Sequence, residues 1–445
     1  MAEAYEPTDF LVLGEERQDV MQPQLDTLPL ELLVEILSYL GTRQDLISCC
    51  EVSKAFYAAA VSPSLWKPLC RKVWRIYKGK DGNWKGCYTE MYMHWGRYEQ
   101  CYAAIRQAWD LIEKYTEEYC PTLLHGLNDG ATEEELNQAE MQNLNGISLP
   151  EDYRCFLRIH NGQKNINRSG VLGSTHIANH FKREAILNVK AATLSLAHMH
   201  GGLRGCIPIT LCVINTCGHY MAITEEAGHK HGRVFWPSLD NETINLNGDG
   251  RMNCFIMADN FTQWFISYAE SLVKEHYPVI RGEIFPYKSA SEHTGDNDIT
   301  VKTATCFLPE QSNANPPRFF FTYRITISMD QSVPKDGSCK LETRHWYITD
   351  GNGEKEEVHG EAVVGSYPTM VPGARHDYVS CTSFTTPTGT MEGHYTFKFL
   401  NREGTTNAKI APMHFKAPPI ELASERQRRR NAKLNIASCT DSDSD

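Results

Sequence analysis

Five histidines crowd into the middle of the 445-residue chain and are the first candidates for chemistry. His198 and His200 are two residues apart, as are His229 and His231, and His219 stands between the two pairs. Side chains at i and i+2 of a strand face the same way, so each pair would present two imidazoles to one zinc ion. No Asp, Glu or Cys ligand stands beside them at a recognisable spacing, and histidines in surface loops are commoner than zinc sites. The sequence therefore predicts no metal and no cofactor.

The motifs that many enzymes use are also missing. The chain contains neither a G-x-S-x-G nucleophile elbow nor a G-x-x-x-x-G-K-[ST] phosphate loop. Its fifteen cysteines include no C-x-x-C pair, so we expect reduced structural thiols and no zinc or redox pair. These residues favour a binding protein over an enzyme.

Composition narrows the class of partner. The chain has 44 Lys and Arg against 55 Asp and Glu, a net charge of −11, so it lacks the positive field that nucleic acids and anionic membranes attract. The N-terminus "MAEAYEPTDF" has no basic n-region or apolar h-region, and no run of 18 apolar residues follows. We therefore expect protein partners, and a location in the nucleus and cytoplasm. The length predicts about three domains.

The first element that must position functional residues is the helix in "LPLELLVEILSYL", residues 28–40. Pro29 suits the first turn of a helix, and Glu31 suits its positive end. At about 100° per residue the apolar side chains form two stripes. The first stripe contains Leu30, Leu33, Val34 and Leu37, and the second contains Pro29, Leu32, Ile36 and Leu40. The three short helices expected in this region cannot bury every apolar face, so the excess apolar surface predicts a partner protein.

This region, from "LPLELLVEILSYL" to "SPSLWKPLC", resembles an F-box, predicted over residues 23–80 after a flexible segment, 1–22. The resemblance rests on Leu28-Pro29, the leucine and isoleucine ladder, Asp45-Leu46, Val52 with Lys54, and Leu65-Trp66. An F-box docks a substrate receptor onto the Skp adaptor of a cullin-RING ubiquitin ligase. The resemblance implies that docking, or its support, falls to Leu28, Pro29, Leu32, Ile36, Leu37, Leu40, Leu46, Val52 and Trp66.

A helical connector, 81–115, is expected next, because Ile105, Trp109, Ile112 and Tyr115 recur with helical spacing. In "GATEEELNQAEMQNLNGISLPEDYRCFLRIHNGQ", Thr132 and Glu135 have capping-box spacing, and a second helix should run from Glu151 to Asn161-Gly162. This stretch resembles the SUKH superfamily, an α/β module of yeast cell-wall regulators and bacterial immunity proteins, which implies protein binding. The module is predicted over 116–277, with strands in "CIPITLCVI", "HYMAITEE" and "GRVFWPSL" and a closing helix in "NFTQWFISYAESLVKEHY".

From residue 278 to 418 the hydrophobic period changes to two. In "RFFFTYRITISM" every second residue from Phe319 to Met329 is apolar, as in a half-buried strand, and "TDGNG" predicts a hairpin turn. Arg344-His345-Trp346, Val363-Val364-Gly365, Pro372-Gly373 and Gly393-His394-Tyr395 stand in the order of the bacterial ApaG family, which this segment resembles. The expected fold is an immunoglobulin or fibronectin-III-like sandwich. The fold class is thus multidomain α+β.

The stretch "GEAVVG", residues 360–365, stands where ApaG proteins carry a G-x-G-x-x-G-like sequence, which has suggested binding of pyrophosphate or nucleotide. Here Ala362 replaces the middle glycine, and its Cβ would hinder a close approach of phosphate to the backbone. No helix is expected to follow, so the positive helix end that favours phosphate is missing as well. We expect a hairpin beside a strand edge.

The final segment, 419–445, is polar and is expected to be disordered. Ser438, Thr440 and Ser442 each have an aspartate three residues downstream, which resembles casein-kinase sites and makes them phosphorylation candidates. The basic run "RQRRR" is more consistent with a solvated tail than with a nuclear signal.

Together the three resemblances imply a substrate-recognition subunit of a Skp-cullin-F-box ligase, which would also contain a RING subunit. Substrates would be captured for proteasomal degradation through the ApaG module, the SUKH module or both. The chain shows neither a RING-like ligand spacing nor a thioester-cysteine domain, so catalysis would come from its partners. The alternative is a scaffold that binds the adaptor and a partner without directing degradation. Candidate substrate contacts are the sandwich aromatics Trp346, Tyr367, Tyr378 and Phe384, although such side chains more often lie in the core.

Overall fold

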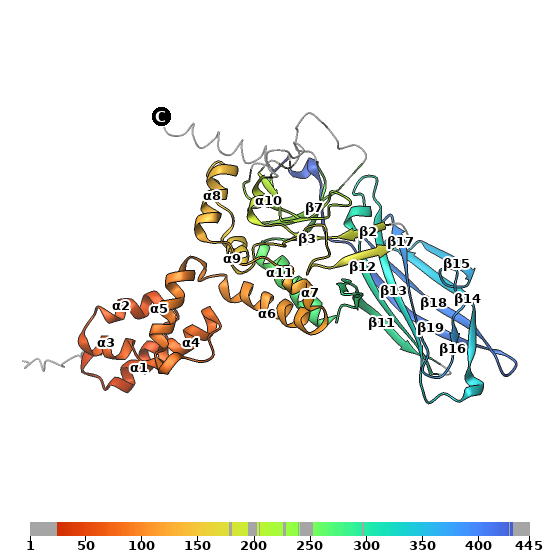
Figure 1. The fold of residues 1–445 in the computed structure, drawn as a ribbon, viewed down its shortest axis with the longest axis horizontal. Helices are drawn as coiled ribbons and strands as arrows, with labels where there is room; N and C mark the ends of the chain where they lie inside the picture. Colours follow the sequence, from red (N-terminus) through yellow and green to blue (C-terminus); the bar gives the residue numbers. More distant parts are fainter. Residues whose placement is uncertain are drawn as a thin grey trace, which may run out of the picture. The chain divides into compact units, whose positions relative to one another are not determined.

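The computed structural model of the chain contains two compact units, 1–99 and 100–445, shown in sequence colours in Figure 1. It describes residues 25–177, 180–194, 203, 205–225, 228–238, 240, 252–295, 298–426 and 428–429. His198, His200 and the phosphorylation candidates Ser438, Thr440 and Ser442 lie outside these residues. Among the helices described, none is long and apolar enough to cross a membrane.

The first unit is built of helices (Figure 1). They are α1 Leu30–Ser38, α2 Arg43–Cys50, α3 Lys54–Ala60, α4 Pro63–Trp74 and α5 Trp84–Trp95, with 3₁₀ turns at Leu25–Thr27, Lys80–Gly82 and Gly96–Tyr98. Side-chain caps set two of the starts: the Thr42 hydroxyl accepts a hydrogen bond from the Asp45 amide, and the Ser53 hydroxyl accepts one from the Phe56 amide. Trp66 and Trp74 pack edge-on against the buried ring of Tyr88, with centroids 5.4 and 5.6 Å away.

The second unit begins with α6, Tyr102–Tyr119. The predicted stripe Ile105, Trp109, Ile112 and Tyr115 is buried. The Trp109 ring lies 5.0 Å from those of both Phe156 and Phe265, which belong to later helices. The predicted connector 81–115 is therefore divided: α5 belongs to the first unit and α6 to the second, because the apolar stripe of α6 finds its core there.

The helices and strands expected for the central module are present. Helices α7 Pro121–His125, α8 Glu133–Asn143, α9 Glu151–Ile159, α10 Val189–Leu194 and α11 Phe261–Lys274 accompany strands β4 Cys206–Pro208, β6 Tyr220–Ala222, β7 Val234–Pro237 and β8 Cys254–Ala258. The short pairs are β1 Ser174–Ile177 with β2 His180–Arg183, β3 Ala185–Ile186 with β5 Thr210–Leu211, and β9 Val279–Ile280 with β10 Glu283–Ile284. The predicted capping box of α8 is confirmed, since Thr132 and Glu135 exchange both hydrogen bonds.

Two antiparallel sheets form the sandwich. One has the order β11-β12-β13-β17 and the other β15-β14-β18-β19, with β16 paired to β14. Their bounds are β11 Lys288–Thr294, β12 Ile299–Phe307, β13 Phe319–Met329, β14 Cys339–Asp350, β15 Lys355–Glu361, β16 Thr369–Met370, β17 Arg375–Phe384, β18 Thr388–Phe399 and β19 Thr405–Lys416, with 3₁₀ turns at Pro309–Gln311 and Lys335–Gly337. The predicted alternation of β13 is confirmed, because every second residue from Phe319 to Met329 is buried.

The "GEAVVG" stretch ends β15 and enters a tight turn, where Val363 pairs with Ser366. Ala362 and Val364 both adopt left-handed backbone conformations, with φ of 60° and 48°. The next element is the short strand β16, so no helix end points at the turn. The turn thus lacks the helix dipole that favours phosphate binding.

Replacing Val364 by glycine should raise the free energy of unfolding of the second unit by about 0.5–1 kcal/mol. A left-handed conformation costs a residue with a Cβ about 1–2 kcal/mol, while glycine adds about 0.5–1 kcal/mol of entropy loss on folding. The side chain is 68% exposed, so little burial is lost. Urea denaturation measures the change. Val371→Gly is the control, because this exposed valine is not left-handed and its loss should lower stability.

The sequence predicted a disordered tail from residue 419, but the chain after the sandwich is still folded at that point. Residues Ile420–Glu421 form β20, which pairs with β8 and makes the outer strand of the sheet β20-β8-β7-β6-β4. A helical turn follows at 423–426. The polar composition of the whole tail hid this short strand, and its pairing partners in β8 lie more than 160 positions earlier in the chain.

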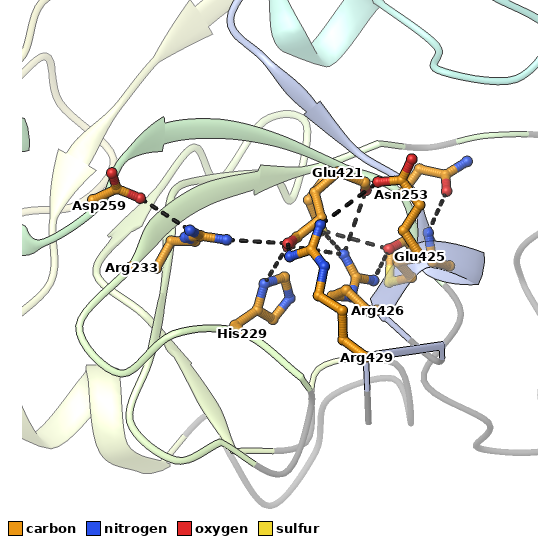
Figure 2. A network of polar contacts seen from close by, with 11 residues as sticks. His229, Arg233, Asn253, Asp259, Glu421, Glu425, Arg426 and Arg429 are labelled. Atoms are coloured by element: carbon orange, nitrogen blue, oxygen red, sulfur yellow. Dashed lines mark hydrogen bonds and ion pairs between the residues drawn. The ribbon is translucent and has the colours of Figure 1, made fainter. Parts of the chain in front are cut away.

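Glu421 lies at the centre of this return (Figure 2). Its carboxylate is 3% exposed and contacts Arg233 at 3.0 Å, Arg429 at 2.8 Å and His229 Nδ1 at 3.0 Å. Arg426, also buried, lies 3.7 Å away. Burial alone would raise the pKa of Glu421, but hydrogen bonding and charge from His229, with the charges of Arg233 and Arg426, lower it to about 2.

Candidate functional site

An exposed apolar face on the first unit is the candidate docking site. In α1, Leu33 and Leu37 are buried, whereas Leu32 and Ile36 remain 46% and 43% exposed. The helix therefore buries Leu33 and Leu37 of the first stripe and leaves Leu32 and Ile36 of the second on the surface. This matches the expectation that the bundle is too small to cover both stripes.

The predicted docking residues separate into two groups. Pro29, Leu32, Ile36 and Val52 are exposed and Leu28 and Leu40 are half-buried, whereas Leu37, Leu46 and Trp66 lie in the unit's own core. Trp66 also donates a 2.7 Å hydrogen bond from Nε1 to the Ala60 carbonyl. The three buried residues can support the face from beneath but cannot touch a partner.

Sequence reasoning missed three exposed apolar residues on or next to α1 and α3. Leu30 was not among the predicted docking residues yet is 48% exposed, because it lies in the first turn of α1. Tyr39 follows α1, and Tyr57 lies on α3, which packs against α1; both are exposed. A residue at the end of a short helix can lie beyond the edge of the core. The angle of a side chain around the helix axis does not show this, but its position at the helix end does. We use the term docking face for the exposed apolar side chains on and next to α1 and α3, which are Leu30, Leu32, Ile36, Tyr39, Val52 and Tyr57.

The four aromatic residues suggested for substrate contact do not form a surface. Trp346 and Phe384 are buried between the sheets, the former with its ring 6.0 Å from that of Tyr323. Tyr378 is half-buried, and its hydroxyl bonds to that of Tyr395. Trp346 and Phe384 are thus corrected to core residues, because their strand positions point toward the opposite sheet. Of the four, Tyr367 is exposed, and it donates a 2.8 Å hydrogen bond to Glu361.

A cavity of about 680 Å³ lies within the second unit, between the central module and the sandwich. Lys182, Glu184, His219 and Trp264 line it on one side, and Phe307 and Phe321 line it on the other. Its wall is therefore a mixture of aromatic rings and hydrogen-bonding groups, which suits a short peptide segment or a small polar ligand.

The charged groups beside the cavity pair with one another. Lys182 Nζ lies 3.7 Å from Glu184 and 3.4 Å from Glu310 of the sandwich, and His219 bonds to Glu184. Burial alone would raise the pKa of Glu184, but His219 and Lys182 lower it to about 2. The cluster joins the two modules.

The histidines considered for zinc are explained differently by the structure. His219 and His229 are buried, each against a different carboxylate, Glu184 and Glu421. His231 is exposed. Among the described residues of that stretch, the histidines thus belong to separate ion pairs and do not converge.

Three family models match the chain in sequence order. They are an F-box-like model over residues 25–72, the SMI1 / KNR4 family (SUKH-1) over 130–267, and the ApaG domain over 309–399. Protein ApaG of Pseudomonas aeruginosa (strain LESB58) is 39% identical over 126 residues, which cover 28% of this chain and 95% of the bacterial protein.

Two mammalian proteins are similar through all three modules. F-box only protein 3 of Bos taurus and of Homo sapiens are each 39% identical to this chain over 408 residues. The alignments cover 90% of this chain and 85% of each relative. Because the similarity runs through the helical unit, the central module and the sandwich, the chain belongs to the F-box only protein 3 family.

Proposed function

We propose that this protein is the substrate-recognition subunit of a Skp-cullin-F-box ubiquitin ligase. The observation that carries the proposal is the docking face, which exposes six large apolar side chains on a unit that matches the F-box-like model. Burying one leucine or isoleucine side chain contributes about 1.5–3 kcal/mol. Several such side chains on one small unit are therefore enough to hold a partner protein.

The proposed role requires no catalytic residue in this chain. Holding a substrate close to a charged conjugating enzyme raises its effective concentration, and the partners supply the transfer chemistry. Among the described cysteines, Cys212 has a lowered thiol pKa, because hydrogen bonding with Cys217 lowers it to about 6. Cys212 is fully buried, so an incoming thioester would not reach it.

Substrate capture falls to the second unit in this proposal. Its cavity offers aromatic rings and hydrogen-bonding groups contributed by the central module and the sandwich together. A peptide segment of the substrate would be recognised by both modules at once, so neither alone would suffice. We propose that the protein performs this role in the nucleus and cytoplasm.

Reconstitution of the complex tests the function. The full chain is mixed with purified Skp adaptor, cullin and RING subunit, and co-elution of all four is measured by size-exclusion chromatography. The proposal expects one complex, and expects ubiquitination of proteins that co-purify with the chain from cells. A complex with the adaptor that never recruits cullin would instead support the scaffold function.

A further inference from the structure

Three histidines lie in a row across the sandwich sheet that contains β14. His345 of β14 is directly opposite His359 on β15 and directly opposite His394 on β18. Residues paired in this way point to the same face of a sheet, with Cβ atoms about 4.5–5.5 Å apart. The ring centroids of His359 and His394 lie 3.4 and 5.1 Å from that of His345.

A carboxylate completes the group. Glu357 is two residues before His359 on β15 and so faces the same side of the sheet. Its Oε1 atom lies 2.5 Å from Nε2 of His345 and 3.8 Å from Nε2 of His359. Potential ligand atoms of these three residues all lie within 4.8 Å of one another.

The ring nitrogen Nε2 of His345 is buried and lacks a well-aligned hydrogen bond. Its residue is 8% exposed, and Nε2 makes no hydrogen bond, because the short contact with Glu357 lacks hydrogen-bond geometry. Tyr347 stacks on the imidazole ring with centroids 4.4 Å apart and helps to bury it. A buried ring nitrogen that lacks a well-aligned hydrogen bond is incompletely satisfied, and a metal–nitrogen bond would satisfy it.

An ion could reach these side chains from solvent. The side chains of Glu357 and His359 are 56% and 67% exposed, so both can rotate and both are open to solvent. The ring centroids of His345 and His359 lie 3.4 Å apart, so both imidazoles are within reach of one ion. Nitrogen and carboxylate ligands of this kind suit Zn²⁺ and its transition-metal neighbours.

We propose that His345, Glu357 and His359 form a binding site for a divalent transition-metal ion such as Zn²⁺, with His394 as a fourth ligand. The ion connects the edge strand β15 to β14 and β18. This edge would otherwise be held by backbone hydrogen bonds on one side alone. The bound ion is therefore expected to stabilise the sandwich.

Metal titration of the full chain tests the site, with Zn²⁺ as the ligand in calorimetry and Co²⁺ as the probe in visible absorption. Wild-type protein, freed of metal and kept reduced, should bind one more Zn²⁺ ion per chain than His359→Ala does, and Zn²⁺ should raise its melting temperature. His359 is largely exposed, so the substitution should leave the melting temperature of the metal-free protein unchanged.

His414→Ala provides the matched control, because His414 is exposed on β19 of the same sheet but lies outside the group. It should keep the wild-type stoichiometry. Glu357→Gln should keep the histidines yet weaken Zn²⁺ binding at least tenfold. The proposal is overturned if wild type, His359→Ala and Glu357→Gln bind Zn²⁺ with the same stoichiometry and affinity, or if the wild type binds none.

Discussion

Changing Leu32 and Ile36 together to aspartate is expected to weaken binding of the Skp adaptor more than a hundredfold. Both side chains are almost half exposed in the free chain, and a partner seated on the docking face would bury them. An unpaired carboxylate buried in an apolar contact costs several kcal/mol, and 1.4 kcal/mol corresponds to tenfold in affinity. The dissociation constant is measured by titrating purified adaptor against the full chain.

The control for this pair is Met93→Asp. Met93 is 77% exposed on α5 of the same unit and is not part of the docking face, so its replacement adds a charge without touching the proposed contact. Circular dichroism should show that both variants fold, because the replaced side chains are exposed. If the double variant binds the adaptor as tightly as the wild type does, the docking face has been assigned to the wrong surface.

The position of the replaced residue separates docking from folding. Leu33 and Leu37 are next to Leu32 and Ile36 in sequence but are 1% and 3% exposed. An aspartate at either position should unfold the first unit, and adaptor binding would be lost together with the helical signal. The proposed double variant should lose binding alone.

Local pattern was sufficient wherever one stretch of chain decides its own structure. The two apolar stripes of α1, the capping box of α8 and the alternation of β13 follow from spacing, because helices and strands repeat at 3.6 and 2 residues. The same reasoning failed at Leu30, since burial at a helix end depends on which element packs there.

Long-range pairing could not be read from the sequence. His345, His359 and His394 are 14 and 35 positions apart, and they meet because strand register, set by a hairpin and a return strand, aligns them. The sequence drew attention instead to closely spaced histidines, of which His219 and His229 lie in separate ion pairs. Trp346 shows the same limit: its alternation was visible, but not which face of β14 meets the second sheet.

The buried carboxylate of Glu421 is expected to stabilise the second unit. Replacing it by glutamine should lower the free energy of unfolding of this unit by about 3 kcal/mol, since removal of one partner from a buried ion pair leaves the other charge uncompensated. In the variant Arg233 would still contact Asp259 at 3.0 Å. Arg426 is buried and would lose the carboxylate that now lies 3.7 Å away. Urea denaturation should therefore show an earlier transition for the second unit and an unchanged transition for the first.

Glu425→Gln is the matched control for Glu421→Gln. Glu425 lies in the same segment and also contacts Arg429, at 3.7 Å, but its side chain is 47% exposed. Exposed ion pairs contribute about 0–1 kcal/mol, so this variant should be nearly as stable as the wild type. Equal losses in the two variants would mean that the segment is held by backbone pairing of β20 and not by the buried carboxylate.

The pH dependence provides an independent check on the same carboxylate. The pKa of Glu421 is lowered to about 2 from an ordinary value of 4.5, so ionised Glu421 stabilises the folded state at every pH above 4.5. That contribution is lost as the pH falls from 4.5 toward 2, because the unfolded chain takes up the proton first. Glu184 and Asp377 also have pKa values lowered to about 2, and the wild type alone would report all three. The difference in unfolding free energy between wild type and Glu421→Gln removes the contributions of Glu184 and Asp377, and it should shrink as the pH falls below 4.5. At higher pH the difference also reports His229, because burial lowers the pKa of that imidazole and its contact with Glu421 raises it.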